Sequence, residues 1–136
     1  MKILGFLIFI VGIGTAMYLS GNIYAFIDLY SILFISITTL SLFISKYGFK
    51  FKEISSDGGL TLVANSSILA GYLGFSISII QILQNLSDVQ AIGPSIAVAL
   101  LFPFYSILIY IICSIFNKKF ILSKLTVLSI ITFTIV

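Results

Sequence analysis

The stretch SIAVALLFPFYSILIYIICSIF, residues 95–116, runs for 22 residues without a charged side chain. As an α-helix, at about 1.5 Å per residue, it would be about 33 Å long. That length matches the hydrocarbon core of a bilayer, which is about 30 Å thick. A helix satisfies its own backbone hydrogen bonds in lipid, whereas a lone strand does not. The stretch therefore predicts a transmembrane helix.

Three further apolar stretches precede it, at residues 3–18, 29–45 and 60–83. Hydrophobic residues make up 60% of the 136 residues, and charged residues only 8%. Soluble domains carry about 25% charged residues. We therefore expect an all-α membrane protein whose residues 1–117 form a domain of four transmembrane helices.

Residues 118–136 form a basic and apolar tail, for which we expect a short helix. The apolar part of this tail, residues 125–136, would be about 18 Å long as a helix, which is short for a crossing. The tail is expected either to lie in the interface or to form a partial fifth span.

The seven Lys all fall on one side of this alternating pattern. They lie before the first stretch, between the second and third, and after the fourth, as Lys2, Lys46, Lys50, Lys52, Lys118, Lys119 and Lys124. The other two connections carry no base. Because basic loops stay in the cytoplasm, this pattern predicts a multi-pass protein with its N-terminus inside.

Several functional classes find no support in the composition. There is no His and one Cys, Cys113, so we expect no metal site, no cofactor and no enzyme activity. The net charge of +3 comes from dispersed Lys without Arg, which does not indicate nucleic-acid binding. The start of the chain resembles a signal peptide, but no small-residue cleavage site follows the apolar run.

Two of the predicted helices carry small and polar residues along one face. On the third they are Gly71, Gly74, Ser78, Gln81 and Asn85, spaced by three or four residues. On the fourth they are Ser95, Ala99, Ser106, Tyr110 and Cys113. These faces either pack helix against helix or line a pore.

Proline and glycine suggest how these helices begin and meet. Gly71 and Gly74 would let a neighbouring helix approach closely, and Pro94 is expected in the first turn of the fourth helix. Pro103 falls in the middle of that helix, where it should produce a kink.

No carboxylate lies in the middle of any apolar stretch. Ion coupling through a membrane usually needs an ionisable group at depth. Either the chain does not couple ions, or another subunit supplies the acid.

Two segments then resemble a known family. QNLSDVQAIGPSIAVALL, residues 84–101, resembles the junction of the third and fourth helices of the flagellar stator protein MotA, and Tyr105 falls on a Tyr of that pattern. GNIYAFIDLYSIL, residues 21–33, is similar to the turn between its first two helices. The chain is identified as a member of the MotA/TolQ/ExbB proton-channel family, nearest the MotA branch.

The resemblance implies a pentamer of such chains in the bacterial inner membrane. The ring would surround a single-span, MotB-like partner whose membrane Asp binds H+ or Na+. In such a complex the third and fourth helices line the interior, and ion flow drives a motor. The residues that this implies as pore-lining are Phe75, Ser78, Gln81, Ala99, Phe102, Pro103 and Ser106.

The sequence also departs from the family pattern. Phe75 stands where the family has an ion-facing Thr, and Phe102 and Pro103 stand where it has a pair of Thr. The large cytoplasmic loop that meets the rotor is missing. A non-conducting membrane scaffold is therefore the alternative. A dimeric four-helix exporter is less well supported, because such proteins need a Glu in the first span and none is present.

Overall fold

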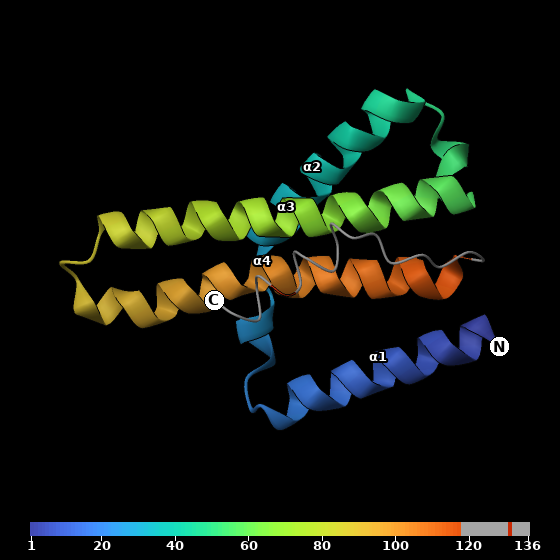
Figure 1. Cartoon of the computed structure of the whole chain (residues 1–136). Coiled ribbons are helices and arrows are strands. Elements are labelled where there is room, and N and C mark those ends of the chain that lie inside the picture. The colour runs from blue at the N-terminus through green and yellow to red at the C-terminus, as the bar shows by residue number, and fades with distance from the viewer. Residues whose placement is uncertain (118–130, 132–136) are drawn as a thin grey trace.

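The computed structural model describes residues 1–117 and residue 131 (Figure 1). Its four α-helices are α1 (Lys2–Leu19), α2 (Leu29–Tyr47), α3 (Asp57–Gln84) and α4 (Val89–Phe116). Two 3-10 helices, η1 (Ile23–Phe26) and η2 (Phe51–Ser55), lie in the connections. The described part contains no strand, so the prediction of an all-α protein is confirmed. The predicted tail helix within residues 118–136 lies outside the described part.

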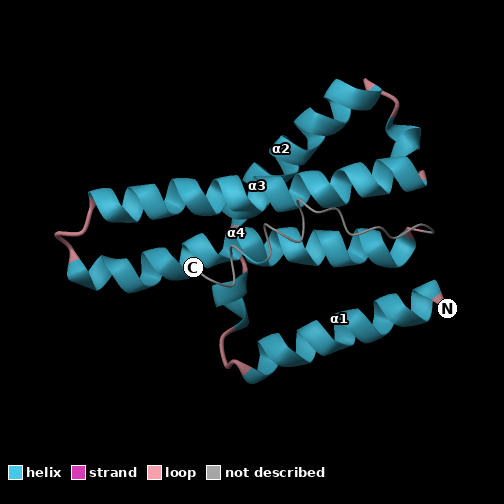
Figure 2. Ribbon diagram, viewed as in Figure 1, coloured by secondary structure: helices cyan, strands magenta, loops and turns pink. Residues whose placement is uncertain are grey.

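Helices α3 and α4 form an antiparallel pair that lies side by side along its length (Figures 1 and 2). Each has 28 residues, which corresponds to about 42 Å of helix. Helix α2 crosses this pair at an angle, and the start of α1 lies near the end of α4, from which the rest of α1 diverges (Figure 1). All four helices are long and apolar enough to cross a membrane, as the sequence predicted.

Local side-chain chemistry fixes the helix ends. The Asp28 carboxylate accepts a hydrogen bond from the Ser31 backbone N–H at 3.1 Å and begins α2. The Ser56 hydroxyl accepts one from the Gly59 N–H at 3.0 Å and begins α3. Gly48 ends α2 with φ of +65°, a conformation that glycine adopts without a steric cost.

The fourth helix begins earlier than its apolar run, at Val89 rather than at residue 95. The prediction that Pro94 lies in the first turn of this helix is therefore wrong, because the five helical residues Val89–Gly93, more than one turn, precede it. Proline there deprives the Gln90 carbonyl of its helical donor. Gln90 is exposed at the end of the bundle, where solvent or lipid headgroups can supply another.

The buried core lies among α2, α3 and α4. One cluster joins Ile35, Ala70 and Phe102, and a second joins α3 to α4 nearer the end of α4. No residue of α1 is buried. Helix α1 contacts α4 through the rings of Phe6 and Phe116, whose centroids lie 5.4 Å apart.

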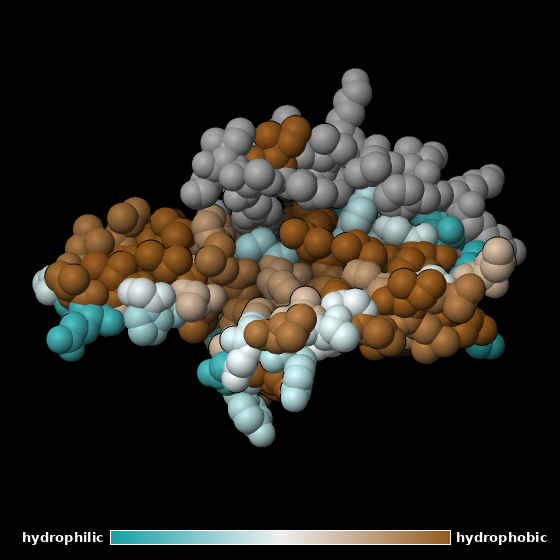
Figure 3. Space-filling view, turned by 90° about the horizontal axis from the view of Figure 1, so that it is seen from below, coloured by the Kyte–Doolittle hydropathy of each residue, from teal (hydrophilic) through white to brown (hydrophobic). Residues whose placement is uncertain are grey.

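The part of the described surface that Figure 3 shows is mostly brown, that is, hydrophobic. Large apolar side chains are exposed on every helix, which suits a lipid environment. The start of α1, the connection between α2 and α3, and the end of α4 lie at one end of the bundle (Figure 1). This arrangement groups Lys2, Lys46, Lys50 and Lys52 at that end, which we call the basic end.

Candidate functional site

The candidate site is the contact surface between α3 and α4, which we call the α3–α4 seam. On α3 it is built from small residues, Ser67, Ala70, Gly71 and Gly74, all of which are buried. A Cβ atom on Gly71 would lie 2.6 Å from the Cβ of Ser106, which is closer than real Cβ contacts. Only glycine at this position allows α4 to approach so closely.

Phe102 fills the seam opposite Gly74. A Cβ atom on Gly74 would lie 2.7 Å from the Cγ of this ring, so the glycine makes room for it. The ring is 1% exposed and meets the rings of Tyr30 at 6.0 Å and Phe34 at 5.6 Å, both edge-on. Such edge-to-face contacts are favourable for aromatic rings. This layer of three rings fills the space between α2 and α4 beside Gly74 of α3.

The hydroxyls of the seam are engaged with nearby backbone. Ser106 donates to the Pro103 carbonyl at 2.9 Å. Ser67 donates to the Ala64 carbonyl at 2.7 Å and lies 3.4 Å from the Ser106 carbonyl. These bonds satisfy polar groups that would otherwise be costly to bury. Of the three, the contact of Ser67 with the Ser106 carbonyl joins α3 to α4.

The predicted pore-lining residues separate into two groups. Ala99, Phe102, Pro103 and Ser106 are buried within the helix bundle, and Phe102 and Ser106 lie in the α3–α4 seam. Phe75 and Ser78 are partly exposed on α3, and Gln81 is exposed. A lining role for them stays a prediction. The structure buries the four α4 residues, places Phe102 and Ser106 against α3, and leaves the three α3 residues reachable from outside.

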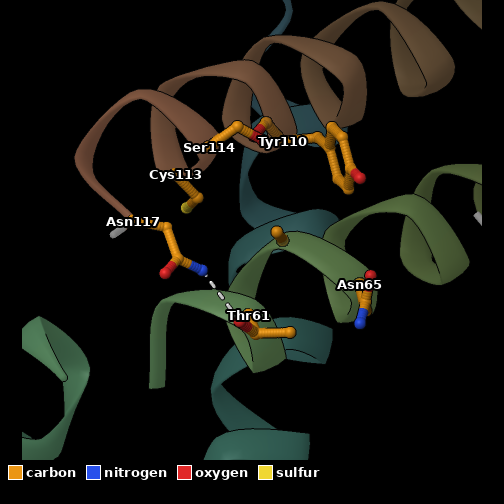
Figure 4. Close-up of a pocket in the computed structure, with 7 residues that line it drawn as sticks. Thr61, Asn65, Tyr110, Cys113, Ser114 and Asn117 are labelled. Atoms are coloured by element: carbon orange, nitrogen blue, oxygen red, sulfur yellow. Dashed lines mark hydrogen bonds between the residues drawn. The ribbon is translucent and has the colours of Figure 1, made fainter. Parts of the chain in front are cut away.

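A polar pocket lies at the basic end of the seam (Figure 4). Its lining includes Thr61 and Asn65 from α3, Ser114 from α4, and Asn117 just beyond α4. The Asn117 amide donates to the Thr61 hydroxyl at 2.8 Å. The cavity volume is about 10 Å³, roughly the room that one water molecule needs. Our sequence analysis missed these four residues, although Thr61 and Asn65 are one helical turn apart.

Tyr105 connects α4 to the segment that precedes α2. Its hydroxyl donates to the Phe26 carbonyl and accepts from the Asp28 backbone N–H at 3.0 Å. Asp28 in turn accepts from the Ser31 hydroxyl at 2.5 Å. Tyr105 thus contacts the segment 21–33 in the folded chain. The sequence resemblance linked both to the same family pattern.

Acidic groups lie away from the middle of the seam. Asp28 and Asp88 precede α2 and α4, Glu53 lies in η2, and Asp57 is the first residue of α3. In the part of the chain that the structure describes, no cluster of three His, Cys, Asp or Glu could hold a metal ion.

Comparison with known proteins identifies the family. Residues 52–129 match the model of the MotA/TolQ/ExbB proton channel family, which is more than half of the 136 residues. The match runs from η2 through α3 and α4 and past residue 117. Neither the curated proteins nor the solved structures yielded a match. On the strength of the matched α3–α4 region, the chain belongs to the MotA/TolQ/ExbB proton channel family.

Proposed function

We propose that this chain is a MotA-like subunit of a channel or motor complex driven by an ion-motive force. It forms a ring, a pentamer, around a single-span MotB-like partner that carries a membrane Asp. The complex lies in the bacterial inner membrane with the N-terminus of this chain in the cytoplasm, and it carries H+ or Na+. The family, a channel type rather than an enzyme class, supports a membrane proton-channel subunit.

This proposal rests on one observation, which is that side chains fill the interior of the protomer. Phe102 packs against Gly74 and is 1% exposed, and Ser106 packs against Gly71. An ion that crosses must therefore pass along the outside of the protomer, between it and another chain. On that outer surface α3 offers the oxygens of Ser78 and Gln81.

The positions of the Asp and Glu residues support the presence of a partner chain. All four Asp and Glu of the sequence lie near helix ends or in connections. Proton or sodium transfer at depth usually uses a carboxylate. A complex that conducts would thus need an acid from a second kind of chain.

Native mass spectrometry of the full chain in detergent tests the ring. We expect a species at five times the mass of the 14.9 kDa chain. A monomer or dimer at all protein concentrations would contradict the ring.

Flux into liposomes tests conduction. The full chain is reconstituted with a synthetic single-span helix that carries one Asp at its centre, and an internal pH dye reports H+ entry under an imposed potential. We expect flux with this helix, and none with the chain alone or with the matching Asn helix. Parallel vesicles with a sodium dye distinguish the ion. Absence of H+ and Na+ flux with the Asp helix would overturn conduction.

Two substitutions test whether the exposed face of α3 borders the ion path. Phe75→Thr should raise the flux because it adds an oxygen ligand, and Ser78→Ala should lower it because it removes one. Ile8→Thr on α1, where Ile8 is 65% exposed, is the matched control and should leave the flux unchanged. If both α3 variants conduct like the original chain, neither position faces the path.

The alternative is a non-conducting scaffold that holds a partner helix. It is favoured by Phe75, which packs against the cluster of Ile35, Ala70 and Phe102 and so keeps this part of α3 apolar. The connection between α2 and α3 spans only residues 48–56, with no room for a large rotor-binding domain. A pentamer that carries no ion with any partner helix would support this alternative.

A further inference from the structure

An apolar groove lies at the basic end, between η2, the start of α3 and the end of α4. It is lined by Phe51, Ile54, Leu60, Ile112, Cys113 and Phe116. Its volume is about 610 Å³, within the range of about 300–1,000 Å³ that is typical of ligand sites. It shares Cys113 with the polar pocket but differs from that pocket in character, because its exposed lining is mostly apolar.

Three lysines lie next to lining residues of this groove, either in the chain or through a hydrogen bond. Lys50 and Lys52 flank the lining residue Phe51 in the chain, and both are exposed. The Lys2 ammonium donates to the carbonyl of Phe116, a second lining residue, at 3.3 Å. Glu53 in η2 and Asp57 at the start of α3 are the two acids of these segments, and Lys2, Lys50 and Lys52 outnumber them.

The position of the groove selects the kind of ligand. It lies at the ends of membrane-spanning helices, where the hydrocarbon of a bilayer meets the headgroups. A ligand that fits must have an apolar chain and a negatively charged head. Basic pockets at the cytoplasmic ends of transmembrane helices suit anionic lipid headgroups.

Two protein segments could also occupy the groove, namely residues 118–136 of the same chain or a second copy, and charge favours the lipid over both. Residues 118–136 of the same chain carry three Lys and no acid, so they would add positive charge to a basic border. A second copy would bring its own basic end. An anionic lipid, by contrast, complements Lys2, Lys50 and Lys52.

We propose that this groove binds one anionic phospholipid, with an acyl chain against Phe51, Ile112 and Phe116 and the phosphate beside Lys50 and Lys52. The proposal does not depend on whether the chain conducts ions. Because bound lipid would join η2 to the end of α4, it would hold the connection between α2 and α3 against the bundle.

A tryptophan reporter tests the groove directly. The sequence contains no Trp, so Phe51→Trp in the full chain gives one fluorescent reporter within the lining. The variant is placed in vesicles of phosphatidylcholine that contain an equal fraction of either brominated phosphatidylglycerol or brominated phosphatidylcholine. Bromine quenches the fluorescence only of a nearby indole.

We expect the quenching to give a relative association constant for the anionic lipid about fivefold or more above that for phosphatidylcholine. Lys50→Gln with Lys52→Gln in the same chain should remove most of this preference. Leu4→Trp, on α1 at the same end and 56% exposed, is the control reporter. Its smaller preference should not change with the two Lys substitutions.

Three results would overturn the proposal. Equal quenching by the two lipids at position 51 would mean that the groove is lined by ordinary lipid. Quenching by neither would mean that residues 118–136 or a second copy cover it. A preference that survives the loss of both lysines would place the headgroup elsewhere. Phe116→Trp repeats the test if Phe51→Trp fails to fold.

Discussion

Gly71 and Gly74 allow α3 and α4 to pack closely because they leave room for the side chains opposite them. Ser106 and Phe102 occupy the space that a side chain at these positions would need. In lipid, helices gain little from burying apolar surface, so close packing supplies much of their association. The two glycines therefore set how closely α3 and α4 pair.

Gly71→Ala should destabilise the fold, because its Cβ would overlap Ser106 and force the helices apart. Overpacking of this kind costs about 1–3 kcal/mol. We expect a lower midpoint of thermal unfolding in detergent, followed by circular dichroism. Gly12→Ala on α1, with nothing within 4 Å of the added atom, is the control and should not lower the midpoint. Equal midpoints for the two variants would contradict the close contact.

The sequence indicated which small residues share a helix face, because helical spacing alone determines that. It did not indicate what the face contacts. Ser106 and Ala99 fitted a pore lining as well as a packing surface, and the structure places both inside the protomer. Hydroxyls such as Ser67 escaped notice because their bonds to backbone carbonyls have no sequence signature.

The helix boundaries, too, were only partly predictable from the sequence. The four spans and their order were predictable, since a charge-free run of this length has few alternatives in a membrane protein. The starts of α3 and α4 were not, because both helices begin before their apolar runs. Ser56 caps α3 four residues before its apolar run, and α4 begins six residues before its own.

The contact of Tyr105 with the segment before α2 gives a prediction about how the elements are joined. Tyr105→Phe removes the group that bridges the Phe26 carbonyl and the Asp28 N–H. An unsatisfied buried partner costs about 1–3 kcal/mol. We expect faster hydrogen exchange at the Asp28 amide and a lower unfolding midpoint.

Tyr24→Phe serves as the comparison, because Tyr24 is 84% exposed and lies in the same connection. Its exchange rates should match those of the original chain. If Tyr105→Phe leaves the Asp28 amide as protected as before, the hydroxyl does not join α4 to this segment.

The grouping of lysines at one end predicts how the whole molecule is oriented in the membrane. The sequence predicted this grouping because an even number of spans returns both ends of the domain to one side. The described lysines do lie at one end of the bundle. That this end faces the cytoplasm remains a prediction.

Cysteine labelling tests the direction in a Cys113→Ala background. A membrane-impermeant maleimide added to intact spheroplasts should label Ser20→Cys and Ser87→Cys, which lie in the connections without Lys. Phe49→Cys, at a position 79% exposed beside the lysines, should react only after permeabilisation. Labelling of Phe49→Cys from outside would reverse the orientation, and opposite behaviour of positions 20 and 87 would contradict four spans.

Helix α1 buries none of its residues, and this has a consequence for biosynthesis. Insertion into lipid satisfies its backbone without help from a neighbour. Of the four described helices α1 is synthesised first, so it can settle in the bilayer as an anchor before α2, α3 and α4 have been translated. These three helices must find one another to cover their small and aromatic faces. We therefore expect two stages of membrane entry, with tethering by α1 first and assembly of the other three helices afterwards.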